Sequence, residues 1–531
     1  MNCLVRSELW ILMAAISAVS WSAAQTDDAN NVSVKSFGAR GDGLNDDTRT
    51  IQAAINALEL RGGGILRVPS GIYLLNSYSP SPHPWYFYNL RVGSNITIQA
   101  DPGAKFLQGP AGRSPLVYGA TEVRNSVLVF GSPNYVVNTF QDANYNGGFM
   151  SLRSTSADDQ SVTLSTPSQA GRFGVGDYVV IYSTIVGDVV PSESSQVTSV
   201  SQSGALGLKN PLARAFSSPY IAKVTSLATV NTGVTGLIVQ GAEPIAINEV
   251  FRFTATGNTF ISDTSIGNGN TYGLNMNEIR GFTFSNNVVT SIGPFYVVQE
   301  LPQRNSQDVV IDSNTFNVRS VGFGEYGVHW TITRNTFSVH PDVRVPAGLA
   351  VGGLDVLFSN NHVQGSTSGV PLMSDFVGLD AYASYVGRIR ILNNIFDCKA
   401  DQTNCLNIVS SGATVSNNRF NVTGNAGEAI LVQSPLPPAA QINGNSISIQ
   451  NGMGIVLNSR GTDNSVVSCN TITSGAGLAG IYVASPATPN QGKDTLSGNT
   501  VTGFRTPIFV DINKHPGTVI DGSTPSCLPV P

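Results

Sequence analysis

Charged residues are scarce in this chain of 531 residues, where Asp, Glu, Lys and Arg together make up 12%. The net charge is -5 and no run of Lys or Arg occurs, so a basic nucleic-acid-binding surface is not expected. Hydrophobic residues reach 41%, which is too many for a disordered chain. Beyond the N-terminal segment, no apolar stretch approaches the roughly 18 residues that span a membrane. The composition therefore predicts a folded protein with neither nucleic acid nor a membrane as partner.

The first 24 residues have the pattern of a secretory signal peptide. Arg6 gives a positive start, residues 9–21 form a short apolar core, and residues 22–24 are small enough for cleavage. An uncleaved anchor is the alternative, but no polar stop-transfer flank follows. We therefore expect cleavage before Gln25 and a secreted protein, either extracellular or periplasmic, with no membrane contact after cleavage.

Cysteine is also rare, with five residues, of which Cys3 would leave with the signal. The remaining four are an even number in an oxidising compartment, which predicts disulfides. Cys398 and Cys405 flank a short turn and could pair locally, and Cys469 and Cys527 would then tie the C-terminal tail to the body. Four cysteines allow three connectivities, and the sequence leaves them open. No Cys or His cluster has the spacing of a zinc site.

Glycine is frequent, with 55 residues, and a degenerate repeat fills the C-terminal half. In each repeat an Asn is followed two residues later by an apolar residue. The repeated residues are Asn258, Asn287, Asn314, Asn335, Asn361, Asn394, Asn418, Asn445, Asn470 and Asn499. Their spacing of 21 to 33 residues is typical of a solenoid. Asn tolerates the left-handed backbone conformation of a tight turn, and stacked Asn side chains can hydrogen-bond from coil to coil.

Short strands precede and follow each Asn turn. Residues 282–284, 309–311, 330–332 and 389–391 alternate apolar and polar side chains, and a second strand type occurs at 429–433 and equivalent positions. One face of each strand therefore points inward. The pattern predicts an all-β fold, a right-handed parallel β-helix with coils about 4.8 Å apart.

The solenoid needs a cap at its N-terminal end. Residues 46–48 begin a predicted amphipathic helix, and Gly62 to Gly64 end it. The repeat fades between about residues 140 and 227, where a turn and strand at 176–182 indicate a β-rich insertion. The sequence leaves open whether this insertion is a small barrel or a set of irregular coils of the same β-helix. The expected parts are a signal peptide (1–24), the N-terminal cap and first coils (25–140), the insertion (141–227), the remaining β-helix coils (228–515) and a C-terminal tail (516–531).

Residues 34–73 carry a long motif. It contains FGARGDG at 37–43, NDDT at 45–48, GGG at 62–64 and VPSGIY at 68–73. This motif resembles the N-terminal signature of the pectate lyase superfamily and of its rhamnogalacturonase- or epimerase-like members. The resemblance implies a β-helix protein that acts on a polysaccharide. It leaves the reaction open, because the superfamily contains hydrolases, lyases, epimerases and phage tailspikes.

Aligning the second strands places a carboxylate in one column of four consecutive coils, which we call the acid row. The row consists of Glu249, Glu278, Glu300 and Glu325, with Gly353 and Asp375 following and the amides Asn248, Asn277 and Gln299 one residue earlier. Adjacent carboxylates about 5 Å apart repel by roughly 3 kcal/mol at an effective dielectric of 20. Such a row persists if it is splayed, partly protonated, bound to a cation or kept for function.

Paired carboxylates favour glycoside hydrolysis. Neighbouring coils give a separation of about 5 Å, which suits a retaining enzyme, and coils two apart give about 9.6 Å, near the inverting limit. Because related β-helix hydrolases invert, we predict Glu278, Glu300 and Glu325 as catalytic. The predicted substrate-binding residues are Glu249, Asn248, Asn277, Gln299, Arg304, Tyr326, His329 and Asp375. A solvated row without chemistry is the alternative.

Two further functions stay open. A polysaccharide lyase acting on a uronate polymer would need a base and a cation, supplied from Arg304, Arg319, Arg334, Tyr326 and His329. Ca²⁺ would then be held by Glu278, Glu300 and Glu325, since it prefers several oxygen ligands; otherwise no cofactor is expected. The third function is non-catalytic glycan binding, as in a tailspike-like fibre. We expect a monomer, with a trimer as the alternative for such a fibre.

Overall fold

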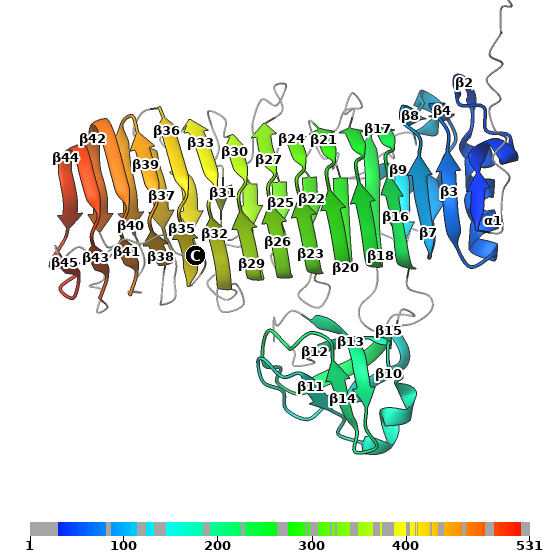
Figure 1. Ribbon diagram of the computed structural model, residues 1–531, viewed down its shortest axis with the longest axis horizontal. Coiled ribbons are helices and arrows are strands. Elements are labelled where there is room, and N and C mark those ends of the chain that lie inside the picture. The colour runs from blue at the N-terminus through cyan, green and yellow to red at the C-terminus, as the bar shows by residue number, and fades with distance from the viewer. Residues whose placement is uncertain are drawn as a thin grey trace, which may run out of the picture.

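The computed structural model is a long solenoid of β-strands with a smaller body beside it (Figure 1). The structure describes residues 30–80, 86–113, 124–131, 145–183, 192–224, 229–262, 274–291, 295–297, 306–318, 321–323, 327–339, 349–364, 372–373, 387–399, 404–408, 410, 412–424, 427–433, 440–458, 464–483, 493–513 and 515–521. Strands of successive coils pair in parallel along the whole solenoid, and the predicted right-handed parallel β-helix is confirmed.

The coils build three parallel sheets, and four long strands bend from one sheet into another. The first sheet precedes the Asn turn. It contains β1 (Asn31–Ser33), β3 (Gly64–Val68), β7 (Ile96–Ala100), β16 (Thr229–Thr235), the second halves of β18 (Glu243–Thr256) and β20 (Leu274–Ser285), β23 (Gln307–Asp312), β26 (Val328–Thr333), β29 (Leu354–Ser359), β32 (Gly387–Leu392), β35 (Ala413–Ser416), β38 (Ala440–Asn443), β41 (Val466–Ser468), β43 (Thr495–Ser497) and β45 (Val519–Asp521).

The second sheet follows the Asn turn. It contains β2 (Asp42–Asp46), β4 (Gly71–Leu75), β8 (Ala104–Gln108), β17 (Ile238–Gly241), β19 (Thr259–Ser262), β21 (Val288–Ser291), β24 (Thr315–Val318), β27 (Thr336–Val339), β30 (His362–Gln364), β33 (Ile395–Lys399), β36 (Arg419–Thr423), β39 (Ser446–Ile449) and the first parts of β42 (Thr471–Val483) and β44 (Thr500–Val510).

The third sheet carries the strands of the acid row. It contains β6 (Tyr86–Val92), β9 (Arg124–Gly131), the first halves of β18 and β20, β22 (Phe295–Val297), β25 (Val321–Phe323), β28 (Leu349–Val351), β31 (Leu372–Met373), β34 (Asn404–Ile408), β37 (Gly427–Val432), β40 (Gly452–Leu457) and the last parts of β42 and β44. The short strand β5 (Ser79–Pro80) pairs antiparallel with β6.

The core is a column of apolar side chains that point inward from all three sheets. Phenylalanine rings stack from coil to coil, for example Phe284 on Phe316 with ring centroids 6.2 Å apart, and Phe316 on Phe337 at 5.0 Å. These side chains alternate with outward polar ones, as in β26, where every second residue is buried. Period-two alternation therefore produces the stacked core that the sequence predicts.

The Asn turns form a continuous buried ladder. The side-chain amide of Asn258 donates to the side-chain oxygen of Asn287 at 2.9 Å, and the same contact repeats down to Asn470 and Asn499. The residue before each repeated Asn has a positive φ, such as Asn286 at 55° and Asn360 at 55°. The ladder satisfies buried polar groups that a turn would otherwise leave without partners.

The N-terminal end is covered by α1 (Thr48–Leu60), whose residues Ile51, Ile55 and Leu58 are fully buried against the first coils. The predicted cap differs in detail, because Asp47 makes no side-chain capping hydrogen bond to the helix. Its carboxylate instead accepts from the backbone N–H groups of Arg40 and Gly41. Short 3₁₀ helices occur at η1 (Val34–Phe37), η2 (Pro110–Gly112) and η3 (Pro167–Arg172).

The insertion is a body of its own beside the lower ends of β18, β20 and β23 (Figure 1). Its strands are β10 (Tyr145–Ser151), β11 (Ser161–Thr163), β12 (Tyr178–Ser183), β13 (Glu193–Val200), β14 (Ala205–Leu208) and β15 (Pro219–Val224). They pair antiparallel in the order β10-β15-β12-β13-β14-β11. A bridge between Leu152 and Leu164 joins the two ends of that order, so the sheet closes into a small barrel with its own apolar core.

Cys398 and Cys405 form the local disulfide that their spacing allowed, between β33 and β34. Cys469 is also disulfide-bonded, and Cys527 lies outside the described residues. The signal-peptide prediction likewise falls on residues 1–29, outside the described chain. None of the described helices has the length and apolar character needed to cross a membrane.

Candidate functional site

The strand register places the first two members of the acid row side by side. Asn248 pairs with Asn277 and Val250 pairs with Ile279, so Glu249 and Glu278 lie at the same level on neighbouring coils. Glu249 has a φ of 54°, where the third sheet bends toward the first, and Asn248 is 2% exposed. Neighbouring parallel strands are about 4.8 Å apart, which brings these two positions within reach of one ligand.

The alignment that placed Glu300 below Glu278 is wrong by one residue at the preceding strand. It pairs Leu274 with Tyr296, but the structure pairs Leu274 with Phe295. A similar slip affects the next coil, where Phe295 pairs with Val321. A slip of one residue turns a side chain to the opposite face of a strand. The two slips run in opposite directions and cancel, so Val321 lies two coils from Leu274, as in the alignment. The described register of β18, β20 and β25 therefore agrees with the acid row, and that of β22 does not.

Most other predicted site residues fall outside the part of the chain that the structure describes. These are Glu300, Glu325, Gln299, Arg304, Arg319, Tyr326 and Asp375. For Asn277 and Glu278 the backbone is described, within β20, and the side chain is not. His329 is the predicted binding residue whose surroundings the structure gives in detail.

His329 belongs to a column of left-handed turn residues at the start of the first sheet. In successive coils this column holds Gly281, Asp308, His329, Asp355, Arg388 and Gly412, with φ between 54° and 70°. Glycine adopts this conformation freely, whereas a residue with a side chain is strained by on the order of 1 kcal/mol. The charged residues in the middle of the column therefore occupy these positions despite a cost in conformational free energy.

These charged side chains contact one another across the coils and form what we call the charge ladder, Asp308–His329–Asp355–Arg388. His329 Nδ1 lies 3.3 Å from Asp308 Oδ1, and His329 Nε2 lies 3.7 Å from Asp355 Oδ2. Arg388 Nη2 donates to Asp355 Oδ2 at 2.6 Å. The hydrogen bond with Asp308 raises the pKa of His329, and the carboxylates of Asp308, Glu193 and Asp355 act in the same direction against the effect of burial.

The barrel contributes a buried ion pair to the same region. Arg214 Nε donates to Glu193 Oε1 at 3.2 Å, and the side chains are 11% and 2% exposed. The backbone N–H of Ala213 donates to the other carboxylate oxygen at 2.7 Å. Burial raises the pKa of Glu193, although the nearby charges of Arg214 and His329 oppose it. The cluster as a whole combines three carboxylates with two arginines and a histidine.

The charges of the ladder and of the Glu193–Arg214 pair act on one another across the interface between the β-helix and the barrel, with Glu193 near His329 and Arg214 near Asp355 and Arg388. Their positions suit docking of the barrel more than proton transfer to a substrate. Sequence reasoning singled out His329 but missed its partners, because Asp308, Asp355 and Arg388 share a place in the coil and no common residue type. The available signal was positional, since each is the second residue of its first-sheet strand and stands directly before an inward apolar residue.

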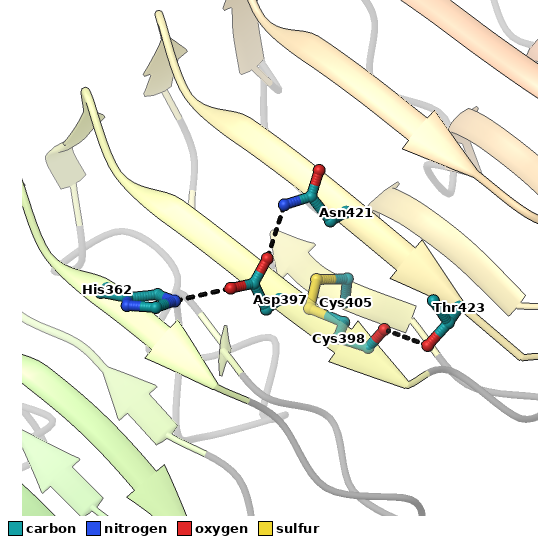
Figure 2. Close-up of a disulfide and its surroundings, with 6 residues drawn as sticks. All are labelled: His362, Asp397, Cys398, Cys405, Asn421 and Thr423. Carbon is teal, nitrogen blue, oxygen red and sulfur yellow. Dashed lines mark hydrogen bonds and ion pairs between the residues drawn. A yellow bond between two sulfur atoms is a disulfide. The ribbon is translucent and has the colours of Figure 1, made fainter.

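A second histidine–carboxylate pair lies on the outer face of the second sheet (Figure 2). His362 Nε2 lies 2.6 Å from Asp397 Oδ2, and Asn421 Nδ2 donates to Asp397 Oδ1 at 2.5 Å. Asp397 immediately precedes Cys398, so the disulfide to Cys405 anchors the strand that carries it. His362 is the first residue of β30.

No metal site is formed by the described side chains, among which no three His, Cys, Asp or Glu residues are grouped suitably. The calcium prediction rests on Glu278, Glu300 and Glu325, whose side chains fall outside that description. Calcium binding therefore stays a prediction.

Sequence comparison supports the resemblance at the N-terminus. Residues 31–88 match the family described as rhamnogalacturonase A/epimerase, pectate lyase-like. The chain is 60% identical over 40 residues to alginate lyase 7 of Azotobacter vinelandii, and 58% identical over 40 residues to mannuronan C5-epimerase AlgE1 of the same organism. These segments cover 8% of this chain and only 5% and 3% of the two relatives.

Structural comparison covers far more of the molecule at low sequence identity. The tailspike protein gp49 of Pseudomonas phage LKA1 aligns over 90% of this chain and 84% of its own, with a TM-score of 0.54 and 15% identity. The tailspike gp61 of Pseudomonas phage phi297 gives the same coverage, with a TM-score of 0.53 and 12% identity. At these identities the likeness concerns the fold alone. The chain is therefore similar to the rhamnogalacturonase A/epimerase, pectate lyase-like family over its N-terminal residues, and its fold is a right-handed parallel β-helix.

Proposed function

We propose that this protein is a secreted enzyme that degrades a polysaccharide, and that it hydrolyses glycosidic bonds with Glu249 and Glu278. The observation that carries the proposal is the register of β18 and β20, in which Asn248 pairs with Asn277 and Val250 with Ile279. Two carboxylates on adjacent coils match the separation of about 5 Å found in retaining glycosidases. The wider pair of Glu278 and Glu325, two coils apart, is the alternative within hydrolysis, because the pairing of β20 with β22 and of β22 with β25 keeps Leu274 at the level of Val321.

The reaction would divide two roles between the two carboxyl groups. One protonates the leaving glycosidic oxygen, while the other attacks the anomeric carbon and forms a covalent glycosyl-enzyme. Water then cleaves this intermediate with the first group acting as base. Mutual repulsion favours the state in which one of the two keeps its proton, which provides the acid for the first step.

The polysaccharide part of the proposal rests on the comparisons. The relatives matched at the N-terminus are named for alginate and mannuronan, which are polysaccharides. A parallel β-helix also offers an extended outer face, with equivalent positions repeated about every 4.8 Å. A glycan chain lying along the third sheet would contact several coils at once.

A lyase acting on a uronate polymer is the second candidate, favoured by the relative named alginate lyase. Elimination needs a base and a cation close to the uronate carboxylate. Among the described basic residues proposed for this role, His329 lies between Asp308 and Asp355, and Arg334 Nη2 donates to Asp312 at 2.5 Å. These groups are engaged in ion pairs, so the lyase would depend on Tyr326, Arg304 or bound calcium.

A panel of neutral and uronate polysaccharides, incubated with the full-length protein, separates the candidates. Reducing ends and unsaturated-uronate absorbance are measured in parallel, with and without a chelator. New reducing ends without absorbance support the hydrolase. Absorbance that disappears with the chelator supports the calcium-dependent lyase and overturns hydrolysis. Binding to a glycan without either product would instead support the non-catalytic, tailspike-like function.

A further inference from the structure

The barrel contacts the β-helix along a seam that crosses several coils. Arg280 Nη2 donates to Ser192 Oγ at 2.9 Å in the coil of β20. One coil further, the backbone N–H of Ser194 donates to Gln307 Oε1 at 2.5 Å, and Gln307 Nε2 donates back to Ser194 O at 2.8 Å. In the coil of β32, Arg388 Nη2 donates to a backbone oxygen of the barrel at 3.0 Å. The barrel is thus docked on the column that contains the charge ladder.

Further contacts at the near end of the seam are apolar or aromatic. The guanidinium of Arg252 lies 4.8 Å from the ring centroid of Tyr178, and the Tyr178 ring lies edge-on to Phe251. Val180 of the barrel is fully buried against Phe251. The described side chains of this part of the seam include no group that changes charge near neutral pH, so these contacts would hold the barrel at any such pH.

His329 lies at the centre of the seam, and its charge changes near neutral pH. It faces Asp308 from β23, Asp355 from β29 and Glu193 from β13. Two permanent cations complete the surroundings, Arg388 from β32 and Arg214 from the loop after β14, and both interact with Asp355. With His329 protonated, three positive groups face three carboxylates. Loss of that proton leaves one carboxylate charge uncompensated in a partly buried interface.

The backbone of the ladder adds an independent argument. Asp308, His329, Asp355 and Arg388 have φ between 54° and 57°, and the same column holds Gly281 and Gly412 on either side of them. Glycine would relieve the strain at each of the four positions. All four positions nevertheless carry side chains, and these side chains contact one another or the barrel.

We propose that the Asp308–His329–Asp355–Arg388 ladder is a proton-dependent latch that docks the inserted barrel onto the β-helix. The inference does not depend on which reaction the protein catalyses. It predicts that the barrel is held most firmly when His329 is protonated.

The direction of the pH effect follows from linkage. The hydrogen bond with Asp308 raises the pKa of His329 whether or not the barrel is docked, because both residues belong to the β-helix. Docking adds the charge of Glu193, which raises the pKa of His329 further, and burial raises the pKa of Glu193. A group whose pKa is raised in the docked state favours docking at low pH. Its contribution is fully present below its usual value, about 6.5 for histidine, and is lost as the pH rises through the docked value. Docking should therefore weaken on the alkaline side.

Hydrogen exchange of the full-length protein measures this docking directly. The reporter is the amide of Ser194, because it donates to Gln307 across the seam. Exchange is followed at about pH 5.5 and about pH 8.5, on either side of the usual histidine pKa, and corrected for the intrinsic rate. Peptides from β36 and β39 on the distant second sheet serve as an internal reference for the fold.

Two substitutions at one position test the charge without disturbing the turn. His329→Asn removes the titrating group, and asparagine is already accepted in this column at Asn95 and Asn231. His329→Arg makes the cation permanent, and arginine is accepted at Arg252 and Arg388. Arg334→Gln is the matched control, since it breaks a similar ion pair with Asp312 outside the seam.

In the wild type, protection at Ser194 should fall with pH, by at most about tenfold per pH unit for one released proton. His329→Arg should stay protected at both pH values, His329→Asn should exchange quickly at both, and Arg334→Gln should follow the wild type. Equal protection of the wild type at both pH values would overturn the latch. A pH dependence that survives in His329→Asn and disappears in Glu193→Gln would also overturn it, because the switch would then be Glu193.

Discussion

Asn361 Oδ1 accepts two hydrogen bonds from Asn335, one from its backbone N–H at 2.9 Å and one from its side-chain amide at 3.0 Å. Twenty-six residues separate the two along the chain. Both residues are 1% exposed, so water cannot replace either bond. Each rung of the ladder therefore fixes the register between two coils and satisfies polar groups inside the turn.

Asn361→Ala should destabilise the protein by about 2–4 kcal/mol, because the buried backbone N–H of Asn335 and the carbonyl of Ile332 both lose their hydrogen bond with the Asn361 side chain. The thermal unfolding midpoint of the full-length protein measures the effect. Asn360→Gly is the matched control, since Asn360 is exposed and has a φ of 55° that glycine adopts without strain. Equal midpoints for the two variants would contradict a stabilising role of the ladder.

The fold could be predicted because every coil carries its own local signals. The repeated Asn marks one corner, and alternating apolar residues mark the inward face, as with Phe282 and Phe284 in β20. The third sheet has no such marker. Without one, the sequence pattern places Tyr296 where the structure has Phe295, although it places Val321 of the next coil correctly relative to Leu274.

The charge ladder could not be predicted from the sequence, for a different reason. Its residues are united by backbone conformation and position, and a left-handed φ at Asp308 or Arg388 is not a property that residue type predicts. The partners on the barrel were even harder to predict, because Glu193 and Arg214 belong to an insertion that lies far from the ladder residues in the sequence. Contacts between segments of that kind depend on tertiary docking, which no local pattern records.

Glu249→Gln and Glu278→Gln should each reduce the turnover of the susceptible polysaccharide by about 10²–10⁴-fold, the usual contribution of a catalytic acid or base. The fold should persist, because glutamine keeps the size of the side chain. Glu428→Gln, in β37 of the third-sheet face, serves as a control with unchanged activity. Product stereochemistry, followed by NMR, should be retained for a pair on adjacent coils. Inversion, or full activity of both variants, would refute the assignment.

Removing the Cys398–Cys405 disulfide should lower stability by about 2–3 kcal/mol, the chain-entropy value for so short a loop. The double variant Cys398→Ala/Cys405→Ala isolates this bond. Reductant alone does not, because Cys469 is also disulfide-bonded. Both sulfurs are buried, so part of the loss will come from packing. A thermal midpoint equal to that of the untreated wild type would mean that the disulfide adds nothing to the folded coils.

The carboxyl group of Asp397 predicts how the stability of the protein changes at acidic pH. Burial acts to raise its pKa, but the hydrogen bonds from Asn421 and His362 outweigh burial and hold the pKa of Asp397 below its usual range (Figure 2). A group with a lowered pKa stabilises the fold above its unfolded value, about 3.9 for aspartate. That contribution is lost as the pH falls through the folded value.

Asp397→Asn mimics the protonated carboxyl group with the same shape. Its thermal midpoint should lie below that of the wild type near neutral pH, and the difference should shrink as the pH falls below about 4. Ser448→Ala, two coils further along the same outer face, is a control that does not titrate, and its difference from the wild type should not vary with pH. A wild-type advantage over Asp397→Asn that persists unchanged at low pH would show that the contacts of Asp397 stabilise the second sheet independently of its charge.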